Sequence, residues 1–191
     1  MRIERDFFER DTLTVAQNLI GQVLVRKTPD GETAGIIVET EAYLGNIDPA
    51  AHSYKRQTER VRVQFGDKGH AYVYMIYGIH HCLNITTGPA GMPEVVLIRA
   101  LEPVRGIELM KRRRSTDVLK NLCSGPGKLC QAMNIDMRLY GEDMCKSDAL
   151  YLELGENSEW EASKRINIPY AGEAVNYLWR FTKKGSCFVS R

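Results

Sequence analysis

The apolar and polar residues of this chain alternate mainly with the two-residue period of β-strands. Residues 22–28 and 32–44 flank a Pro-Asp-Gly turn, a pattern that predicts a β-hairpin. Residues 70–78 and 80–87 predict a second strand pair. The Val, Ile and Leu content of 94–103 indicates a strand that is buried. The late strands are predicted over 149–155, 177–182 and 186–190.

Segments with a helical period are fewer and lie between these strands. Residues 11–21 predict a helix, for which Asp11 or Thr12 can serve as the N-cap. Pro103 is predicted to open a second helix that runs to Arg114, because proline is well tolerated in the first turn of a helix. A third helix should begin at the Gly-Pro pair at 125–126.

The order of these elements predicts the fold class. Residues 45–70 are polar, with no sustained period, and are predicted to form a long ordered loop of the kind that often carries function. Strands and helices mix without a regular βαβ rhythm. We therefore predict an α+β fold, a single compact domain over residues 1–191 around a mainly antiparallel sheet.

Composition narrows the class of protein. The longest apolar runs are far shorter than the roughly 20 residues that a membrane span needs, and the first residues do not resemble a signal peptide. We therefore expect a cytoplasmic protein with no membrane partner. The 5 cysteines are odd in number and lack CxxC spacing, which disfavours a disulfide framework or a zinc knuckle and predicts free, buried thiols.

The net charge of +2 permits nucleic acid as a partner without requiring it. Basic residues nevertheless gather in two places. The first is the segment 52–62, which contains Lys55, Arg56, Arg60 and Arg62. The second is the uninterrupted KRRR run at 111–114, which fits either the C-terminal end of a helix or a contact with DNA.

Two glutamates lie within the predicted strand IIVETEAYL (36–44). Residues two apart share a face of a strand. The face predicted to join the core consists of Ile36, Val38, Thr40, Ala42 and Leu44. Glu39 and Glu41 share the other face with Ile37 and Tyr43, so that face is expected to line something polar. A solvated sheet face fits this segment equally well.

Aromatic residues occupy the next strand and its turn. Tyr72 and Tyr74 share a face, and Tyr77 directly precedes Gly78 at the turn. A tyrosine there is either exposed, as a wedge between stacked bases would be, or folded back over the sheet edge. Together with the acid pair and His52 in the basic loop, these rings suit a site that stacks a flat ring beside acid–base chemistry.

Two polar residues lie in strands that should be buried. The row Val95, Leu97, Arg99 and Leu101 shares one face, so the guanidinium must be paired, either with a carboxylate such as Glu41 or with a phosphate. Asn84 is an amide within a predicted strand, either as a reader of base edges or as a satisfied structural amide.

Several long motifs, taken in their order and spacing, resemble the alkyladenine (3-methyladenine) DNA glycosylase family. They are VETEAYLGNIDPAAHS, YVYMIYGIHHCLNI, LIRALEP and CSGPGKLCQAM, followed by AGE (171–173) and WRF (179–181). The resemblance implies a curved antiparallel sheet and a monomeric, monofunctional enzyme that uses water as nucleophile, with no metal or cofactor. Its implied partner is double-stranded DNA with damaged purines of the 3-methyladenine, 7-methylguanine, hypoxanthine and ethenoadenine class, which it flips out of the duplex.

The resemblance also implies roles for individual residues. Glu41 would be the general base that activates water, and Arg99 would position that water and the phosphate of the flipped nucleotide. Tyr77 would fill the gap left in the base stack. The base pocket would be formed by Tyr43, His52, Tyr74 and Asn84, the last of which would reject the exocyclic amine of guanine. Glu39 is expected to have a structural role in an ion pair.

Contacts with the DNA backbone are expected from Arg56, Arg60 and Lys128, the last at the start of a helix where free N–H groups favour a phosphate. Three positions depart from the family pattern. Val61 and Gln64 lie in a loop expected near the strand opposite the flipped base, and His80 stands where an aromatic residue is common.

Other functions fit part of the pattern. A carbohydrate-active glycosidase could use Glu39 and Glu41 as its two carboxylates. A second alternative is a nucleic-acid-binding module without catalysis, or a homologue that has lost activity, but the presence of Glu41, Arg99 and Tyr77 together argues against it. A metal site is a weaker alternative, because the histidines at 70, 80 and 81 show no ligand spacing.

Overall fold

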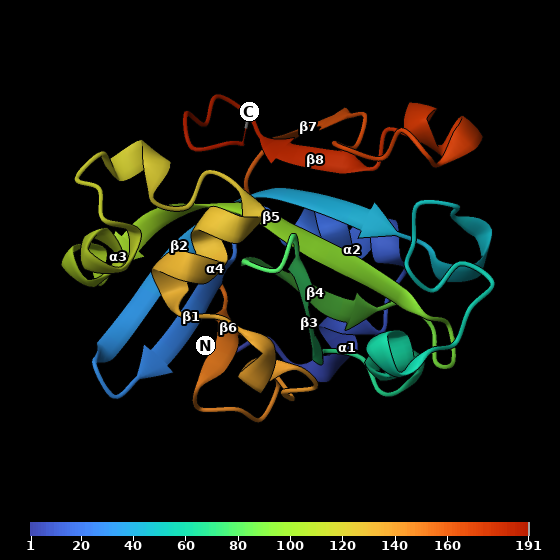
Figure 1. The fold of residues 1–191 in the computed structure, drawn as a ribbon, viewed down its shortest axis with the longest axis horizontal. Coiled ribbons are helices and arrows are strands. Elements are labelled where there is room, and N and C mark those ends of the chain that lie inside the picture. The colour runs from blue at the N-terminus through green and yellow to red at the C-terminus, as the bar shows by residue number, and fades with distance from the viewer. Residues whose placement is uncertain (191) are drawn as a thin grey trace.

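The centre of the molecule is an antiparallel sheet in which the two longest strands, β2 and β5, lie side by side (Figure 1). The computed structural model describes residues 1–190. Its strands are β1 (Val23–Thr28), β2 (Gly31–Tyr43), β3 (Ala71–Ile76), β4 (His80–Thr87), β5 (Glu94–Arg105), β6 (Leu150–Glu153), β7 (Trp160–Ser163) and β8 (Arg180–Lys183). They form an 8-stranded sheet in the order β3-β4-β5-β2-β1-β6, with β8 paired to β2 and β7 to β8. The predicted α+β fold with an antiparallel sheet is confirmed.

Short helices pack against this sheet. The α-helices are α1 (Arg5–Phe8), α2 (Thr12–Asn18), α3 (Ile107–Arg114) and α4 (Pro126–Met133). The 3₁₀ turns are η1 (Gly45–Ile47), η2 (Glu59–Phe65), η3 (Leu119–Asn121), η4 (Met137–Leu139) and η5 (Gly172–Asn176). Helix α2 packs on β2, and α4 packs on β4 and β5. Apolar residues of both helices and of the sheet therefore share one core cluster.

Local sequence signals account for most of these elements. The Asp11 side chain accepts hydrogen bonds from the amides of Leu13 and Thr14 and so caps α2, as predicted. Both predicted hairpins form, β1 with β2 and β3 with β4. The predicted loop of residues 45–70 is ordered by η1 and η2 and contributes no strand to the sheet. Helix α4 begins at Pro126, as the Gly-Pro pair predicts.

The prediction that Pro103 opens a helix is wrong. Strand β5 continues through Pro103, which pairs with Gly35 across the ladder, and ends at Arg105. Gly106 then turns the chain with φ of 69°, and α3 begins one residue later. A Cβ at Gly106 would lie 2.2 Å from the Glu32 carbonyl oxygen, so this turn requires glycine.

The predicted strand over 186–190 is also wrong. Strand β8 pairs with β2 on one side and with β7, which lies earlier in the chain, on the other, while residues 186–190 form turns and irregular backbone. This backbone path places Ser190 where its amide and hydroxyl donate hydrogen bonds to the buried carboxylate of Glu39. In Figure 1, β7 and β8 lie together along the top of the molecule, with the C-terminus beside them.

Two bulges between β2 and β5 change the faces expected for these strands. The register passes from Ile98↔Thr40 to Ala100↔Glu39 and then to Leu101↔Ile37, so Arg99 on β5 and Val38 on β2 each lack a partner in the ladder. Ile37 and Leu101 consequently pack in the main core, not on the faces predicted for them. The bulges lie beside the acid pair.

The cysteine prediction holds in part. All five thiols are free, and Cys82, Cys123 and Cys130 are buried, but Cys145 is half-buried and Cys187 is exposed. Within residues 1–190 there is no helix that combines the length and the apolar character needed to cross a membrane.

Candidate active site

A cavity of about 850 Å³ opens beside the C-terminal end of β2, where Tyr43 lines it. Its walls come from β2 to β5, from the loop before η2, from the start of α4 and from residues 166–170. The predicted site residues that line it are Tyr43, His52, Arg60, Tyr74, Tyr77, Asn84, Arg99 and Lys128. The structure thus brings together residues that are up to 85 positions apart in the sequence, from Tyr43 to Lys128.

Glu41 lies directly behind the cavity wall. The residue is fully buried, which rules out the solvated sheet face for this position. Its Oε2 accepts a hydrogen bond from the Tyr43 hydroxyl at 2.8 Å and one from Arg99 Nη1 at 3.4 Å. Its Oε1 accepts one from the Ile166 amide at 2.8 Å. All three of these donor residues line the cavity, so the carboxylate lies one residue layer behind the cavity surface.

The pKa of Glu41 reflects this position. Burial raises it above the ordinary value of 4.5, while Arg99, the Ile166 amide and the Tyr43 hydroxyl oppose that rise by stabilising the ionised form. Burial, followed by the charge of Glu41, raises the pKa of Tyr43 well above 10, so that phenol stays protonated and remains a donor. A general base with a raised pKa binds a proton more strongly than an exposed carboxylate does.

Glu39 occupies a different environment two residues away on the same strand. It is fully buried, and its oxygens accept hydrogen bonds from Arg99 Nε at 2.9 Å and from Arg180 Nε at 2.7 Å. The Ser190 amide and hydroxyl donate at 2.6 and 2.8 Å. The ion pair predicted for Glu39 is confirmed. Neither Glu39 nor Glu41 lines the cavity itself.

Arg99 joins the two glutamates. Its Nε and Nη1 donate to Glu39 and Glu41, and its Nη2 donates to Ser190 Oγ at 3.2 Å. The prediction that a carboxylate neutralises this buried cation is confirmed. Because Arg99 lies at the bulge on β5, its side chain reaches the acidic face of β2 while its neighbours Ile98 and Leu101 stay in the core.

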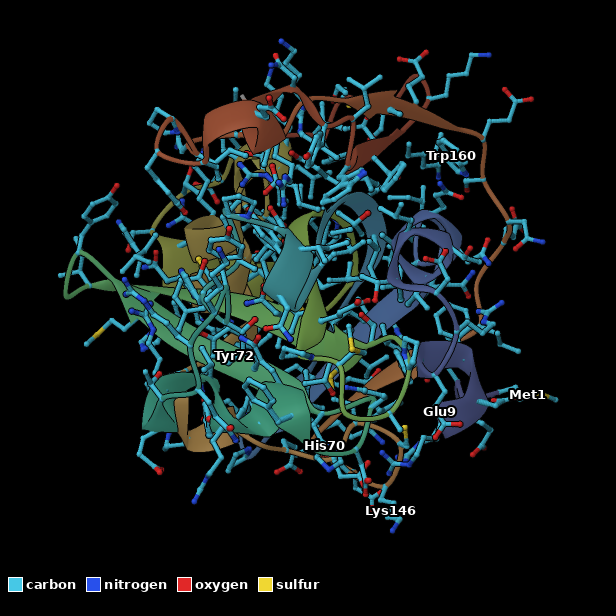
Figure 2. All side chains as sticks on the ribbon, turned by 90° about the vertical axis from the view of Figure 1, so that its right-hand side faces the viewer. Met1, Glu9, His70, Tyr72, Lys146 and Trp160 are labelled. Carbon is cyan, nitrogen blue, oxygen red and sulfur yellow. The ribbon has the colours of Figure 1, made fainter. Side chains whose placement is uncertain are left out.

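Aromatic rings and His52 form one wall of the cavity. The His52 ring lies 4.6 Å from Tyr74, edge to face, and its Nδ1 is 2.9 Å from the Tyr72 hydroxyl. Burial, assisted by the charge of Arg60, lowers the pKa of His52 to about 4, so the imidazole is neutral at physiological pH. In Figure 2, Tyr72 lies within the body of the molecule, whereas His70 and Lys146 lie near its lower edge.

Asn84 and Tyr77 lie at opposite ends of the β3–β4 hairpin. The Asn84 amide donates to the Tyr72 carbonyl at 3.1 Å and lines the cavity, so it is both a satisfied structural amide and part of the pocket. Tyr77 has positive φ of 52° at the turn and is 87% exposed. The alternative in which Tyr77 folds back over the sheet edge is therefore wrong.

The predicted basic contacts differ in position. The guanidinium of Arg60 lies 5.1 Å over the Tyr74 ring and reaches into the cavity. Lys128 lines the far side of the cavity in the first turn of α4, where the N-cap Gly125 leaves the first amides without a side-chain cap. Arg56 is exposed on the loop and is not part of the cavity wall.

Three residues depart from the family pattern, namely Val61, Gln64 and His80. Val61 and Gln64 are each 1% exposed, so both side chains pack inside the protein, and the expected position of their loop near the opposite DNA strand stays a prediction. Gln64 instead lines the cavity, as does His80, next to Gly127.

Sequence reasoning missed several residues that complete the site. Ile166 contributes a backbone amide, which no side-chain pattern signals. Ser190 and Tyr170 also line the cavity, although 186–190 had been expected to form a strand. Arg180 was visible only as part of the WRF motif, with no indication that it would contact Glu39.

Comparisons with known proteins agree with this geometry. The family described as Methylpurine-DNA glycosylase (MPG) matches residues 6–187. A protein of Bacillus cereus (strain G9842), named "Putative 3-methyladenine DNA glycosylase", is 51% identical, with 100% of both chains covered. A protein of Bacillus thuringiensis (strain Al Hakam) with the same name is 49% identical over the same shares. The predicted family is thereby confirmed: the chain belongs to the methylpurine-DNA glycosylase family and is a DNA glycosylase, a hydrolase of N-glycosidic bonds.

Proposed function

We propose that this protein excises damaged purines from double-stranded DNA by flipping the nucleotide into the cavity and hydrolysing its N-glycosidic bond with water activated by Glu41. The observation that carries the proposal is the position of Glu41, whose three donor residues line a cavity with aromatic walls. The protein is expected to act as a monomer, with residues 1–191 as one glycosylase domain, in the cytoplasm.

Glu41 keeps capacity for a water molecule. A carboxylate can accept about four hydrogen bonds, and three are already made by Tyr43, Arg99 and Ile166. The remaining lone pair can accept a proton from water. The water oxygen then forms a bond to C1′ of the sugar as the bond from C1′ to the purine nitrogen breaks, and the electron pair of that bond leaves with the base.

The buried charges favour this reaction. Cleavage of the glycosidic bond builds positive charge on the sugar, and an ionised carboxylate nearby stabilises it. Arg99 keeps Glu41 ionised despite its burial and can also orient water or the phosphate of the flipped nucleotide. A 3-methyladenine or 7-methylguanine base already carries positive charge in the nucleotide, so it leaves as a neutral base without a proton from the protein. Hypoxanthine and ethenoadenine are neutral in the nucleotide, so each must take up a proton from solvent to leave as a neutral base.

The cavity walls suit a flat ring. Tyr43, Tyr74 and neutral His52 offer aromatic surfaces, and a cationic purine stacks well on electron-rich rings. Asn84 supplies an amide beside this space and would crowd the exocyclic amine of guanine. We therefore propose selection for purines of the 3-methyladenine, 7-methylguanine, hypoxanthine and ethenoadenine class.

The rim of the cavity suits duplex DNA. Tyr77 projects from the hairpin turn and can occupy the gap that a flipped nucleotide leaves in the stack. Arg56, Arg60 and Lys128 would contact phosphates around that point, and Arg60 would have to move off the Tyr74 ring for a base to stack there.

The carbohydrate-active glycosidase alternative lacks a second carboxylate that is available for catalysis. A two-carboxylate mechanism needs a second acid that is free to act, but four hydrogen bonds from Arg99, Arg180 and Ser190 occupy the carboxylate of Glu39. Glu41 and Arg99 together also argue against a module that binds DNA without catalysis.

The test is base release from duplexes that each carry one 3-methyladenine, 7-methylguanine, hypoxanthine or ethenoadenine. The expected products are the free base and an abasic strand that stays intact until alkali is added, because water is the nucleophile and no lyase step follows. Binding without release at all four lesions would instead support the binding module. Strand cleavage without alkali would contradict the monofunctional mechanism.

A further inference from the structure

A second fully buried ion pair lies behind the cavity, formed by Asp48 and Arg165. Both side chains have no exposed surface. The pair is bidentate: Arg165 Nη1 donates to Asp48 Oδ2 at 2.5 Å, and Nη2 donates to Oδ1 at 2.8 Å. Asp48 also accepts hydrogen bonds from the amides of Leu44 and Ala50. A buried pair with this geometry is rigid, because breaking it strands a charge away from water.

The Arg165 guanidinium connects segments that are distant in the sequence. Nη1 also donates to the Ala42 carbonyl at 2.9 Å, and Nη2 to the Ala174 carbonyl at 3.4 Å. Its central carbon lies 4.7 Å from the centre of the Tyr43 ring and 5.0 Å from that of Trp179. Arg165 therefore fixes the end of β2, the loop around η1 and the segment that follows β7 in one arrangement.

That arrangement bears directly on Glu41. The residue after Arg165 is Ile166, whose amide donates to Glu41 Oε1 at 2.8 Å. Tyr43, which packs against the guanidinium, donates its hydroxyl to Glu41 Oε2. Two of the three hydrogen bonds to Glu41 thus come from groups that Arg165 holds in place, and Arg165 itself does not touch the carboxylate.

We propose that Arg165, locked by Asp48, is a positioning residue that holds the Ile166 amide and the Tyr43 ring against Glu41 and so keeps this carboxylate oriented and ionised. The inference rests on the proposed function in one respect, that Glu41 is the catalytic base. A lysine could not replace Arg165, because a point charge does not reproduce the planar fork that meets Asp48 and two carbonyl groups at once.

Several other groups act on Glu41 and would remain in a variant at Arg165. Arg99 from β5 contacts it directly, and Glu39 is its neighbour along β2. The further titratable or charged groups around it are Tyr74 on β3, Cys82 on β4, Arg180 on β8 and Tyr170. Because these groups stay, a change in the titration of Glu41 reports on the Ile166 and Tyr43 contacts.

The experiment is a carbon-13 NMR titration of the Glu41 carboxyl carbon, assigned by its absence in Glu41→Gln. We compare the wild-type chain with Arg165→Met and Arg165→Lys. Arg165→Met should raise the pKa of Glu41 by about one unit, the size expected for loss of a hydrogen bond to a charged group. Arg165→Lys should give a smaller rise in the same direction. If Arg165→Met does not fold, Asp48→Asn loosens the same pair with little change in shape and should also raise the pKa.

Arg5→Met is the matched control. Arg5 pairs with Asp143 at 2.7 Å, also between distant segments, but neither residue contacts Glu41 or the cavity. The Arg5→Met variant should have a lower melting temperature and an unchanged pKa of Glu41. An unchanged titration in a folded Arg165 or Asp48 variant would overturn the proposal, as would an equal shift in Arg5→Met.

Base release measured on the same samples separates this inference from the proposed function. A shifted titration together with a slower release that recovers as the pH is raised supports both. A shifted titration in a protein whose wild type releases no base supports the positioning of Glu41 and contradicts the proposed reaction. Release by the wild type with no shift in Arg165→Met contradicts only the positioning.

Discussion

Glu39 and Glu41 lie on the same strand, are both fully buried and share Arg99, yet their surroundings differ in kind. The Glu39 region is closed: two arginine Nε groups and both the amide and the hydroxyl of Ser190 donate to its carboxylate. The Glu41 region is open in the sense that its carboxylate accepts three hydrogen bonds of about four possible, and all three donor residues, Tyr43, Arg99 and Ile166, line the cavity. At Glu39, Arg99 and Ser190 also line the cavity, but Arg180 does not, and four hydrogen bonds fill the acceptor positions. Burial alone therefore does not distinguish a structural acid from a catalytic one.

The difference lies in how completely each carboxylate is paired. At Glu39 the donors include two cations, so the charge is neutralised and the hydrogen-bonding capacity is used. At Glu41 the nearest cationic nitrogen is 3.4 Å away, and burial raises the pKa despite three donors. The first environment suits structural cohesion of β2, β5 and β8, and the second suits proton transfer to a group that enters the cavity.

The largest expected effect is the loss of catalysis in Glu41→Gln. The amide keeps the size of the side chain but cannot accept a proton from water, so base release should slow by about 10²–10⁴-fold. Binding of a hypoxanthine duplex should stay close to that of the wild type. Single-turnover kinetics measure base release, and a titration with the same duplex measures binding. A residual rate within tenfold of that of the wild type would mean that another residue is the general base.

Glu39→Gln should mainly affect stability. It leaves Arg180 and part of Arg99 without a counter-charge in a buried site, so the free energy of unfolding should fall by about 3–5 kcal/mol. Glu41→Gln should change the free energy of unfolding by less than about 1 kcal/mol. Arg99 keeps its ion pair with Glu39 in this variant, and the substitution removes a buried charge that is costly to hold away from water. Urea unfolding of the two variants checks this order, and a reversal would show that the comparison is wrong.

Much of the fold was predictable from local patterns. The cap at Asp11 and the Gly-Pro start of α4 are set by groups close in sequence, and both hairpins follow from two-residue periods that flank short turns. The late strands were harder. Residues 186–190 have the apolar content of a strand, whereas β7 is short and mostly exposed. The sequence therefore does not show that β7, and not 186–190, pairs with β8.

The candidate site was predictable in its side chains and less so in its arrangement. The acid pair and Arg99 stand out in the sequence, because charges inside apolar strands require partners. The bulges at Val38 and Arg99 are not visible in a two-residue period, yet they set which residues face the acids. Ile166 acts through its backbone, and Arg165 follows Ser163 and Lys164 outside any predicted strand, so the sequence does not indicate that it is buried.

The pH dependence of base release should follow Glu41. Its pKa lies above 4.5, and only the ionised form accepts a proton, so the rate should fall about tenfold per unit as the pH drops below that raised value. The folded-state pKa is also raised relative to the unfolded state, so the contribution of Glu41 to stability is present at low pH and is lost as the pH rises through the folded value. A pH–rate profile and pH-dependent unfolding of wild type and Glu41→Gln test both signs.

The smallest effect is expected from single hydroxyl groups around the two carboxylates. Tyr43→Phe removes one donor from Glu41, so the acid limb of the pH–rate profile should move upward by about one unit, while the rate at neutral pH falls less than about tenfold. Ser190→Ala removes a hydroxyl donor from Glu39, and it should lower stability slightly without moving that limb. Equal shifts in the two variants would mean that the carboxylates act as one coupled pair, and the distinction between a closed and an open region would fail.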